Sequence, residues 1–322
     1  IGSGLVGSEM CIRDRYNTLI AGGFDMEHYE KKGYLSSDFR LFHLTDRSIP
    51  NIKYHYHEFD KITILIKGNV HYTIEGRTYQ LEPYDMVLVR HNEIHRPIVD
   101  TTTPYERIII YISPTFIENY RTQDYDLGYC FQKAAKKESS VLRIPTRQKS
   151  ILFQTIQRLE ESFSSDGYAN ELYRQVLFLE FMIHLNRAAH ARQLFFLDTA
   201  VYNEKIADIL HYINANLSAH LSIDDLASRF YLSKYYMMRL FKSETGYSLG
   251  NYITQKRLLF AKDLILQGSP VLEACFDCGF QDYSTFSRAY RKCFHESPRQ
   301  TLTSESSPVS ADDWGDCNRN SE

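Results

Sequence analysis

Short apolar runs separated by turn signals occupy the first part of the chain, from about Phe39 to Ile112. The runs are rich in Ile, Val, Leu and Tyr and cover residues 62–66, 70–74, 86–89 and 108–112. Turn signals containing Gly, Asn or Pro separate them at 67–69, 75–77 and 82–84. Runs of this length with such boundaries are typical of β-strands. Their close spacing predicts a small antiparallel barrel or sandwich.

The periodicity of apolar positions changes after Pro145. Residues 148–163 and 170–187 carry apolar side chains at helical spacing, which predicts a pair of amphipathic helices. These side chains are Ile151, Ile156, Leu159 and Phe163 in the first segment, and Leu172, Val176, Leu179, Phe181 and Ile183 in the second. Two roles stay open for this pair, a dimer seam or a lid over the barrel.

Residues 203–302 predict two short helical units joined by a longer helix. Ser222 and Ser233 are residues that cap helix N-termini, so we expect helices after them that extend to Phe230 and Gly246. Small Ala227 permits the close helix crossing of a helix-turn-helix. The connecting helix covers 248–267, and the second unit has helices at 271–277 and 282–294 with a turn at 278–280.

The second helix of the first unit recurs loosely in the second unit. Residues 233–246 are repeated 49 positions later. The matching pairs are Ser233 with Asp282, Arg239 with Arg288, Phe241 with Tyr290, and Lys242 with Arg291. A repeated helix that carries cations beside aromatic core positions predicts one nucleic-acid-reading unit used twice.

Each repeated helix presents one polar face. Tyr235, Met238 and Arg239 share a face at spacing i, i+3, i+4, opposite a core of Met237, Leu240 and Phe241. Tyr283, Ser284, Ser287 and Arg288 form the matching face. Arginine can bind guanine bidentately, and the Tyr, Met and Ser side chains can contact thymine methyls, base edges or phosphate. We assign phosphate contacts to Lys234, Lys242, Arg291 and Lys292. A merely solvated cationic face is the alternative.

Histidines gather in the strand region. His55 and His57 precede one predicted strand, Lys61 lies at its start, and His95 follows a later strand. This order resembles the cupin pattern, in which His-x-His, a Glu and a later His bind a metal inside the barrel. Lys61 occupies the Glu position, and its charge repels a divalent ion, so we expect no metal and no other cofactor. An organic effector held by His55, His57, Lys61 and His95 is favoured. Solvated or internally satisfied histidines are the alternative.

Carbohydrate is the effector class that we expect, because polar and aromatic groups such as Tyr54 and Tyr56 suit hydroxyls and sugar faces.

The motif Cys275-x-x-Cys278, with Cys293 and His295, superficially suggests a zinc site. Both members of the pair fall where a helix-turn-helix needs small buried residues. We therefore interpret them as core residues, with redox sensing as a minor alternative.

Composition sets the outer limits of these hypotheses. The 322 residues suffice for two domains, and no apolar run approaches the roughly 20 residues that span a bilayer. Without Cys11, which lies in the adapter-like residues 6–15, five unevenly spread cysteines remain. They do not suggest disulfides, so we expect a cytoplasmic protein without a membrane partner. Residues 203–302 hold 12 Lys and Arg against 10 Asp and Glu, which is compatible with DNA binding.

The two ends of the chain are set apart. Residues 6–15 resemble a translated sequencing adapter, and 21–25 can be back-translated as a ribosome-binding sequence, so we expect 1–25 to be an artefact and the natural start to be Met26. Residues 303–322 hold one Arg against five Asp and Glu and predict a disordered acidic tail.

The C-terminal region resembles the AraC/XylS family of transcription regulators. The residues that carry the resemblance include Arg239-Leu-Phe-Lys242, Arg257, Ala261, Leu264, Gly279-Phe280, Phe286-Ser-Arg288 and Ser297-Pro298. The resemblance implies base contacts on the two polar helix faces, an effector-sensing cupin-like domain upstream, and no enzymatic activity. His295 stands where the family has Gly, and Thr301 where it often has an aromatic residue.

The predicted protein is thus an α+β multidomain regulator. We expect a cupin-like antiparallel barrel at 26–145, a helical dimerisation or linker region at 146–202, and an all-α double helix-turn-helix domain at 203–302. Its expected partners are double-stranded DNA, a small-molecule effector, RNA polymerase and a second copy of the chain. Two alternatives stay open, a metal-dependent cupin enzyme with an accessory DNA-binding module and a regulator without an effector.

Overall fold

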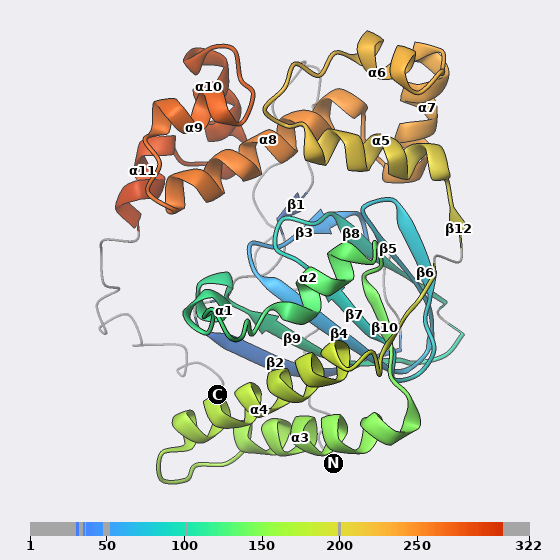
Figure 1. The fold of residues 1–322 in the computed structure, drawn as a ribbon, viewed down its shortest axis with the longest axis vertical. Coiled ribbons are helices and arrows are strands. Elements are labelled where there is room, and N and C mark those ends of the chain that lie inside the picture. The colour runs from blue at the N-terminus through green and yellow to red at the C-terminus, as the bar shows by residue number, and fades with distance from the viewer. Residues whose placement is uncertain are drawn as a thin grey trace, which may run out of the picture. The chain divides into compact units, whose positions relative to one another are not determined.

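The protein divides into two compact units. The computed structural model describes residues 30–31, 35, 37–47, 52–100, 102–198 and 201–304 (Figure 1). One unit extends to Asp208 and also includes Glu244–Gly246, and the other comprises Ile209–Ser243 and the residues from Tyr247 onward. The predicted leader artefact at 1–25 and start at Met26 lie outside the described residues, as does the predicted tail from residue 305 onward. The last helix extends to Ser304, two residues beyond the predicted end of the helical domain.

Two six-stranded sheets form the first unit. The first sheet has the order β1 (Glu30–Lys31), β3 (His55–Tyr56), β8 (His95–Asp100), β5 (Asn69–Ile74), β6 (Arg77–Gln80) and β12 (Val201–Tyr202). The second has the order β11 (Phe195–Phe196), β10 (Val141–Arg143), β7 (Met86–Val89), β4 (Asp60–Lys67), β9 (Tyr105–Ile112) and β2 (Phe39–Asp46). Apart from the parallel β1–β3 pair, the described pairings are antiparallel, which confirms the prediction.

Strand alternation divides the second sheet into two faces. On β4, Ile62 and Ile64 belong to the core beneath the helices, whereas Leu65 belongs to a core shared with the first sheet. Lys61 pairs in register with Val89 and Tyr111 and therefore shares their face, which points between the sheets. The period of two thus places Lys61 inside the barrel.

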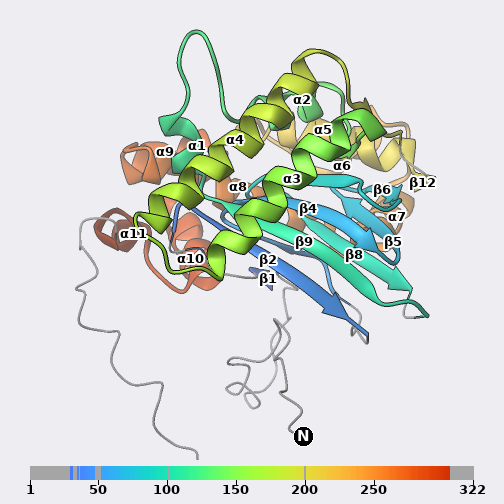
Figure 2. The ribbon, with the colours of Figure 1, turned by 90° about the horizontal axis from the view of Figure 1, so that it is seen from below.

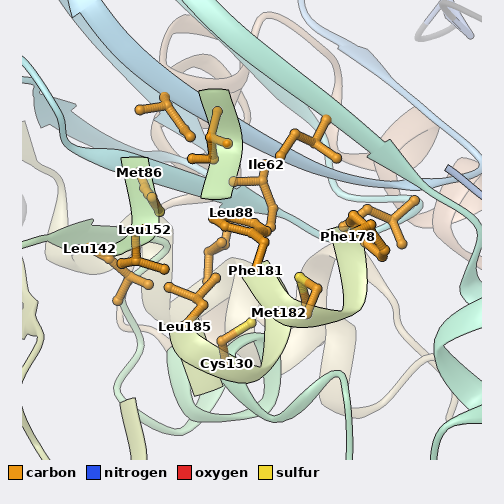
Figure 3. Close-up of a cluster of buried hydrophobic side chains, with 14 of the residues drawn as sticks. Ile62, Met86, Leu88, Cys130, Leu142, Leu152, Phe178, Phe181, Met182 and Leu185 are labelled. Carbon is orange, nitrogen blue, oxygen red and sulfur yellow. The ribbon is translucent and has the colours of Figure 1, made fainter. Parts of the chain in front are cut away.

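Helices α3 (Thr146–Phe163) and α4 (Asn170–His190) lie side by side across the outer face of the second sheet (Figure 2). Phe181 and Leu185 of α4 pack against Ile62 and Leu88 of the sheet in the core drawn in Figure 3. Two short helices that the sequence did not predict, α1 (Pro114–Asn119) and α2 (Tyr129–Lys136), add residues to the same core.

The apolar residues predicted along α4 lie on two different faces of the helix. Phe181 is fully buried against the sheet, whereas Leu172, Val176 and Ile183 are exposed on the outer side. The prediction that these residues share one face was therefore wrong for Phe181. The physical reason is that α4 also buries Leu177 and Phe178, so its inner face is centred away from the stripe. The helix covers the sheet and still presents apolar side chains outward.

The second unit is helical throughout. Its helices are α5 (Glu204–Ala215), which crosses the unit boundary, α6 (Ile223–Arg229), α7 (Lys234–Thr245), α8 (Leu249–Leu266), α9 (Val271–Asp277), α10 (Tyr283–Phe294) and α11 (Pro298–Ser304). The predicted caps are confirmed: Ser222 Oγ accepts from the Asp225 N–H at 3.0 Å, and an Asp282 carboxylate oxygen accepts from the Thr285 N–H at 2.7 Å. Helix boundaries therefore follow the capping residues.

The two residues that differ from the family pattern, His295 and Thr301, both lie near the end of this unit. His295 follows α10 in the left-handed conformation, with φ of 60°, as predicted for a residue that replaces glycine there. Thr301 is buried, and its hydroxyl lies 2.8 Å from the hydroxyl of Tyr290. A polar pair thus occupies the position where an aromatic side chain was expected.

The paired cysteines belong to the core of the second unit, as predicted. Cys275 and Cys278 are fully buried beside Phe286 and Tyr290. Burial raises the pKa of the Cys278 thiol to about 12 and also raises that of Cys275. Thiols held neutral in this way are poor nucleophiles and poor metal ligands.

A histidine links three elements of the first unit. His43 on β2 lies 2.8 Å from Glu160 of α3 through Nδ1 and 3.1 Å from Glu106 of β9 through Nε2. Burial lowers the pKa of His43, but the hydrogen bonds and charges of Glu160 and Glu106 outweigh it and raise that pKa above its ordinary 6.5. The imidazolium therefore stabilises the contact between the sheet and α3.

We predict that His43→Gln destabilises the first unit in a pH-dependent way. A raised folded pKa means that the contribution is complete below the unfolded value of 6.5 and is lost as pH rises through the folded value. Urea unfolding across this range, above about pH 5 where the glutamates stay ionised, should show a free-energy difference that shrinks with increasing pH. The same substitution in a Glu106→Gln/Glu160→Gln background should show no such trend, and a difference that grows with pH would contradict the assignment.

Candidate functional site

Three histidines converge inside the barrel. His55 of β3 and His95 of β8 are partners in the strand register, and their ring centroids lie 4.4 Å apart. The ring of His57 lies 5.1 Å from that of His55 and 4.9 Å from that of His95. One nitrogen of each ring lies within 4.8 Å of the other two, and all three side chains are buried. The structure thus brings together three of the four predicted effector residues.

Backbone carbonyl groups orient two of these rings. Nδ1 of His55 lies 2.9 Å from the carbonyl oxygen of Lys53, and Nδ1 of His95 lies 2.9 Å from that of Glu93. Because a carbonyl oxygen only accepts, Nδ1 of each ring is the donor in these contacts. Nε2 of His95 is buried without a hydrogen-bond partner among the described residues.

Lys61, the fourth predicted residue, lies in the same layer of the barrel. Its Nζ is 5.7 Å from the centroid of the Tyr111 ring, and that ring is 5.8 Å from His57. Burial lowers the pKa of His95 well below its ordinary value, and the charges of His55, His57 and Lys61 lower it further. His95 is therefore neutral at physiological pH, which fits the lone pair on its Nε2.

Aromatic rings that the sequence did not single out line this cluster. Phe59 stacks on His57 with centroids 4.7 Å apart, and Tyr72 lies parallel to His95 at 6.0 Å. Phe59 and Tyr111 are in contact and belong to one buried cluster. For Tyr72 and Tyr111, the period of two along β5 and β9 was the available sequence signal, whereas Phe59 precedes β4 and carries none. The three buried histidines thus lie among aromatic rings, and small-ligand sites commonly combine a few polar groups with apolar surface in this way.

Helix α7 presents the first predicted reading face. Tyr235 and Met238 are exposed at 77% and 39%, and Arg239 is also exposed, whereas Met237 and Phe241 are fully buried. Leu240 is only half-buried. The Nζ of Lys234 lies 3.0 Å from a carboxylate oxygen of Asp224, so its charge is partly neutralised within the unit. Lys242 is exposed at the end of the helix.

Helix α10 presents the second predicted reading face, of which a smaller part is exposed than on α7. Ser284, Arg288 and Arg291 are exposed, and Ser287 is half-buried. Tyr283 differs from the prediction of a surface residue, because it is half-buried and packs on Phe286 with ring centroids 6.0 Å apart. Arg288 Nε donates to the carbonyl of Ser284 at 3.3 Å, which holds the guanidinium along the helix surface.

A close backbone approach joins the two helical pairs. Arg257 of α8 donates from Nε to the Leu217 carbonyl at 3.0 Å and from Nη2 to the Ala219 carbonyl at 2.7 Å. Gly279, with φ of +91°, covers this contact: a Cβ there would lie 2.3 Å from the Leu217 oxygen. Only glycine fits, because both the conformation and the space exclude a side chain. This junction fixes the second helical pair, α9 and α10, against the loop between α5 and α6, which precedes the first pair, α6 and α7.

These features define a class of protein, a transcription regulator that combines a ligand-binding β-barrel with two helix-turn-helix units. Two family models match the chain, an AraC-like ligand binding domain over residues 45–182 and a helix-turn-helix domain over residues 226–304. The regulatory protein SoxS of Escherichia coli strain K12 is 35% identical over 94 residues, which are 29% of this chain and 88% of SoxS. The chain belongs to the AraC family of transcription regulators.

Other relatives match across both units. The lactose operon transcription activator of Staphylococcus xylosus is 23% identical over 251 residues, which are 76% of this chain and 85% of that protein. The probable transcriptional regulator LumQ of Photobacterium leiognathi is 25% identical over 246 residues, 76% of this chain and 90% of LumQ. Among the described residues, no helix is long and apolar enough to cross a membrane.

We predict that Gly279→Ala disrupts the helical domain. The backbone conformation alone costs about 1–3 kcal/mol for a residue with a Cβ, and the clash with the Leu217 carbonyl adds to this cost. Thermal unfolding should show a lower midpoint for this unit. Gly250→Ala is the matched control, since nothing lies within 4 Å of a Cβ built there, and it should be neutral or stabilising by up to about 1 kcal/mol. Equal midpoints for the two variants would contradict the junction.

Proposed function

We propose that this protein is a cytoplasmic regulator that reads a two-part DNA site with α7 and α10 and responds to a small molecule in the barrel. The observation that carries the proposal is the pair of exposed basic faces on repeated helices, each backed by a buried aromatic core. Recognition helices of helix-turn-helix proteins enter the major groove in this way. Because its relatives are transcription regulators, we propose that it acts without catalysis.

The two faces suit successive major grooves of one duplex. One helical turn of DNA separates such grooves by roughly 34 Å, and α8, with 18 residues, provides a linker of about 27 Å at 1.5 Å per residue. Arg239 and Arg288 are the best candidates for guanine contacts, with Tyr235, Met238, Ser284 and Ser287 around them. Tyr283 would then act mainly by positioning α10. Lys234, Lys242, Arg291 and Lys292 would neutralise phosphates.

A carbohydrate is the effector class that the barrel favours. The cluster of His55, His57 and His95 offers hydrogen-bond acceptors, while Phe59 and Tyr111 offer flat apolar surface. Sugar hydroxyls donate to such nitrogens, and sugar faces pack on aromatic rings. The match to a lactose operon activator supports the same class. Lys61 would add a cation for a hydroxyl or an acidic group.

Dimerisation through α4 and contact with RNA polymerase complete the proposed regulator. Leu172, Val176, Leu179 and Ile183 follow the 4-3-4 spacing of a coiled-coil seam, and the first, second and fourth are exposed. An apolar stripe of this kind suits a second copy of the chain. A DNA-bound regulator that activates transcription also needs a surface for polymerase.

The DNA-reading proposal predicts a selectable operator. Purified protein should enrich, from random duplexes, a two-part site with centres about 10 bp apart. Arg239→Ala and Arg288→Ala should each cost about 1–3 kcal/mol of binding free energy, and the double variant should lose the site. Lys205→Ala removes an exposed cation of α5, which belongs to neither α7 nor α10, and serves as the control. Enrichment that persists in the double variant would overturn the assignment of the faces.

The dimer proposal predicts a change in molar mass. Val176→Glu combined with Ile183→Glu places two charges on the outer stripe of α4 and should convert a dimer into a monomer in multi-angle light scattering. Ile98→Glu, at an exposed apolar position of β8, should leave the mass unchanged. A monomeric parent protein, or a dimer that survives the double substitution, would refute this seam.

A further inference from the structure

A basic surface on the first unit takes no part in the functions described so far. Residues 127–137, which include α2, and residues 181–197, which include the end of α4, contain no Asp or Glu. The two stretches together carry five Lys and Arg side chains. Because the whole chain has a formal net charge of −3, this density of positive charge is local.

Hydrogen bonds join the two stretches into one surface. The side-chain oxygen of Asn186 on α4 accepts from the N–H of Cys130 on α2 at 2.9 Å. Just beyond α2, the hydroxyl of Ser139 donates to the carbonyl of Leu197 at 2.7 Å. The segments are therefore fastened to each other near both ends, and their cations share a continuous surface. We call it the α2–α4 basic surface.

Most of these cations are available to an external partner. Lys133 is held within the unit, because its ammonium group donates to the carbonyl of Ala189. The other four are exposed and form no ion pair with any described residue: Lys136, Lys137, Arg187 and Arg192. The surface thus presents four positive charges that the described part of the chain does not neutralise.

The ends of the two helices explain only part of this charge. Cations are favourable in the last turn of a helix, whose carbonyls carry about half an elementary negative charge. Lys133 and Lys136 occupy that turn of α2, and Arg187 occupies that of α4. Two helix ends offset about one positive charge, whereas the surface carries five. The excess charge favours a partner with many negative charges.

We propose that the α2–α4 basic surface binds the phosphate backbone of the duplex outside the two-part site. This inference rests on the proposed function, because DNA reading by α7 and α10 brings a polyanion to the protein. Duplex DNA carries about one negative charge per 1.7 Å of its length, so it can meet several cations at once. Phosphate contacts add affinity and carry no direct sequence information. The first unit would thus strengthen binding without changing the sequence that is read.

The salt dependence of binding tests this assignment. The full chain is titrated with a selected duplex of about 20 bp and with one of about 40 bp, at about 50 to 200 mM salt. Each phosphate contact adds about 0.9 to the slope of log affinity against log salt. Replacing the four exposed cations of the surface by Gln should lower the slope on the longer duplex by about 2–4 and leave the selected sequence unchanged.

Two variants serve as controls. A second fourfold Gln variant removes exposed cations elsewhere in the first unit and should keep the slope of the parent protein; its positions are Arg40, Lys53, Lys67 and Arg90. Lys136→Arg/Lys137→Arg keeps the charge and should also bind like the parent protein. An equal fall in slope in both fourfold variants, or no fall in either, would overturn the proposal.

The same measurements separate this inference from the DNA-reading proposal. A parent protein that selects its site, with a slope that the first fourfold variant does not change, refutes the basic surface alone. A parent protein that selects no site, but whose binding to random duplex weakens in that variant, refutes the reading faces alone. Loss of transcription activation without any change in slope would assign the surface to an acidic protein and would overturn the phosphate assignment.

Discussion

The contact between Arg257 and the Leu217 and Ala219 carbonyls is the constraint on which the DNA-reading arrangement depends. Two helix-turn-helix units joined only by a helix could rotate about it, and their reading faces would then have no fixed relation. The guanidinium donates from the connecting helix α8 to the loop between α5 and α6, and Gly279 leaves room for that contact. The left-handed backbone conformation of Gly279 thereby fixes the relative geometry of the two recognition helices, α7 and α10.

Strand periodicity plays the corresponding part in the barrel. Alternate residues of β4, β7 and β9 face either the helical cover or the interior between the sheets, so the same strands contribute to two separate cores. Lys61 and Tyr111 reach the interior for this reason. The histidines meet there because β3 and β8 are paired. The helices α3 and α4 pack on the outer face of the second sheet, whereas the histidines lie between the sheets.

Local signals in the sequence predicted the elements that depend on local physics. Ser222 and Asp282 cap the helices that they were expected to cap, and the long apolar runs became β4 and β9. Helices α1 and α2 were missed because they are short, with six and eight residues, and strands of two or three residues carry no periodicity. Tyr283 is more buried than the sequence suggested, because a residue at a helix start can pack partly against the core.

The candidate sites were predictable only in part. Residue types identified His55 and His95, but their orientation depends on the backbone carbonyl groups of Lys53 and Glu93, for which a sequence holds no signal.

The central claim is that α7 and α10 read two parts of one DNA site. Methylation protection of guanine N7 on a selected duplex tests this claim most directly. The account predicts two protected clusters one helical turn apart, one lost in Arg239→Ala and the other in Arg288→Ala. A single cluster, or simultaneous loss of both in either variant, would contradict it.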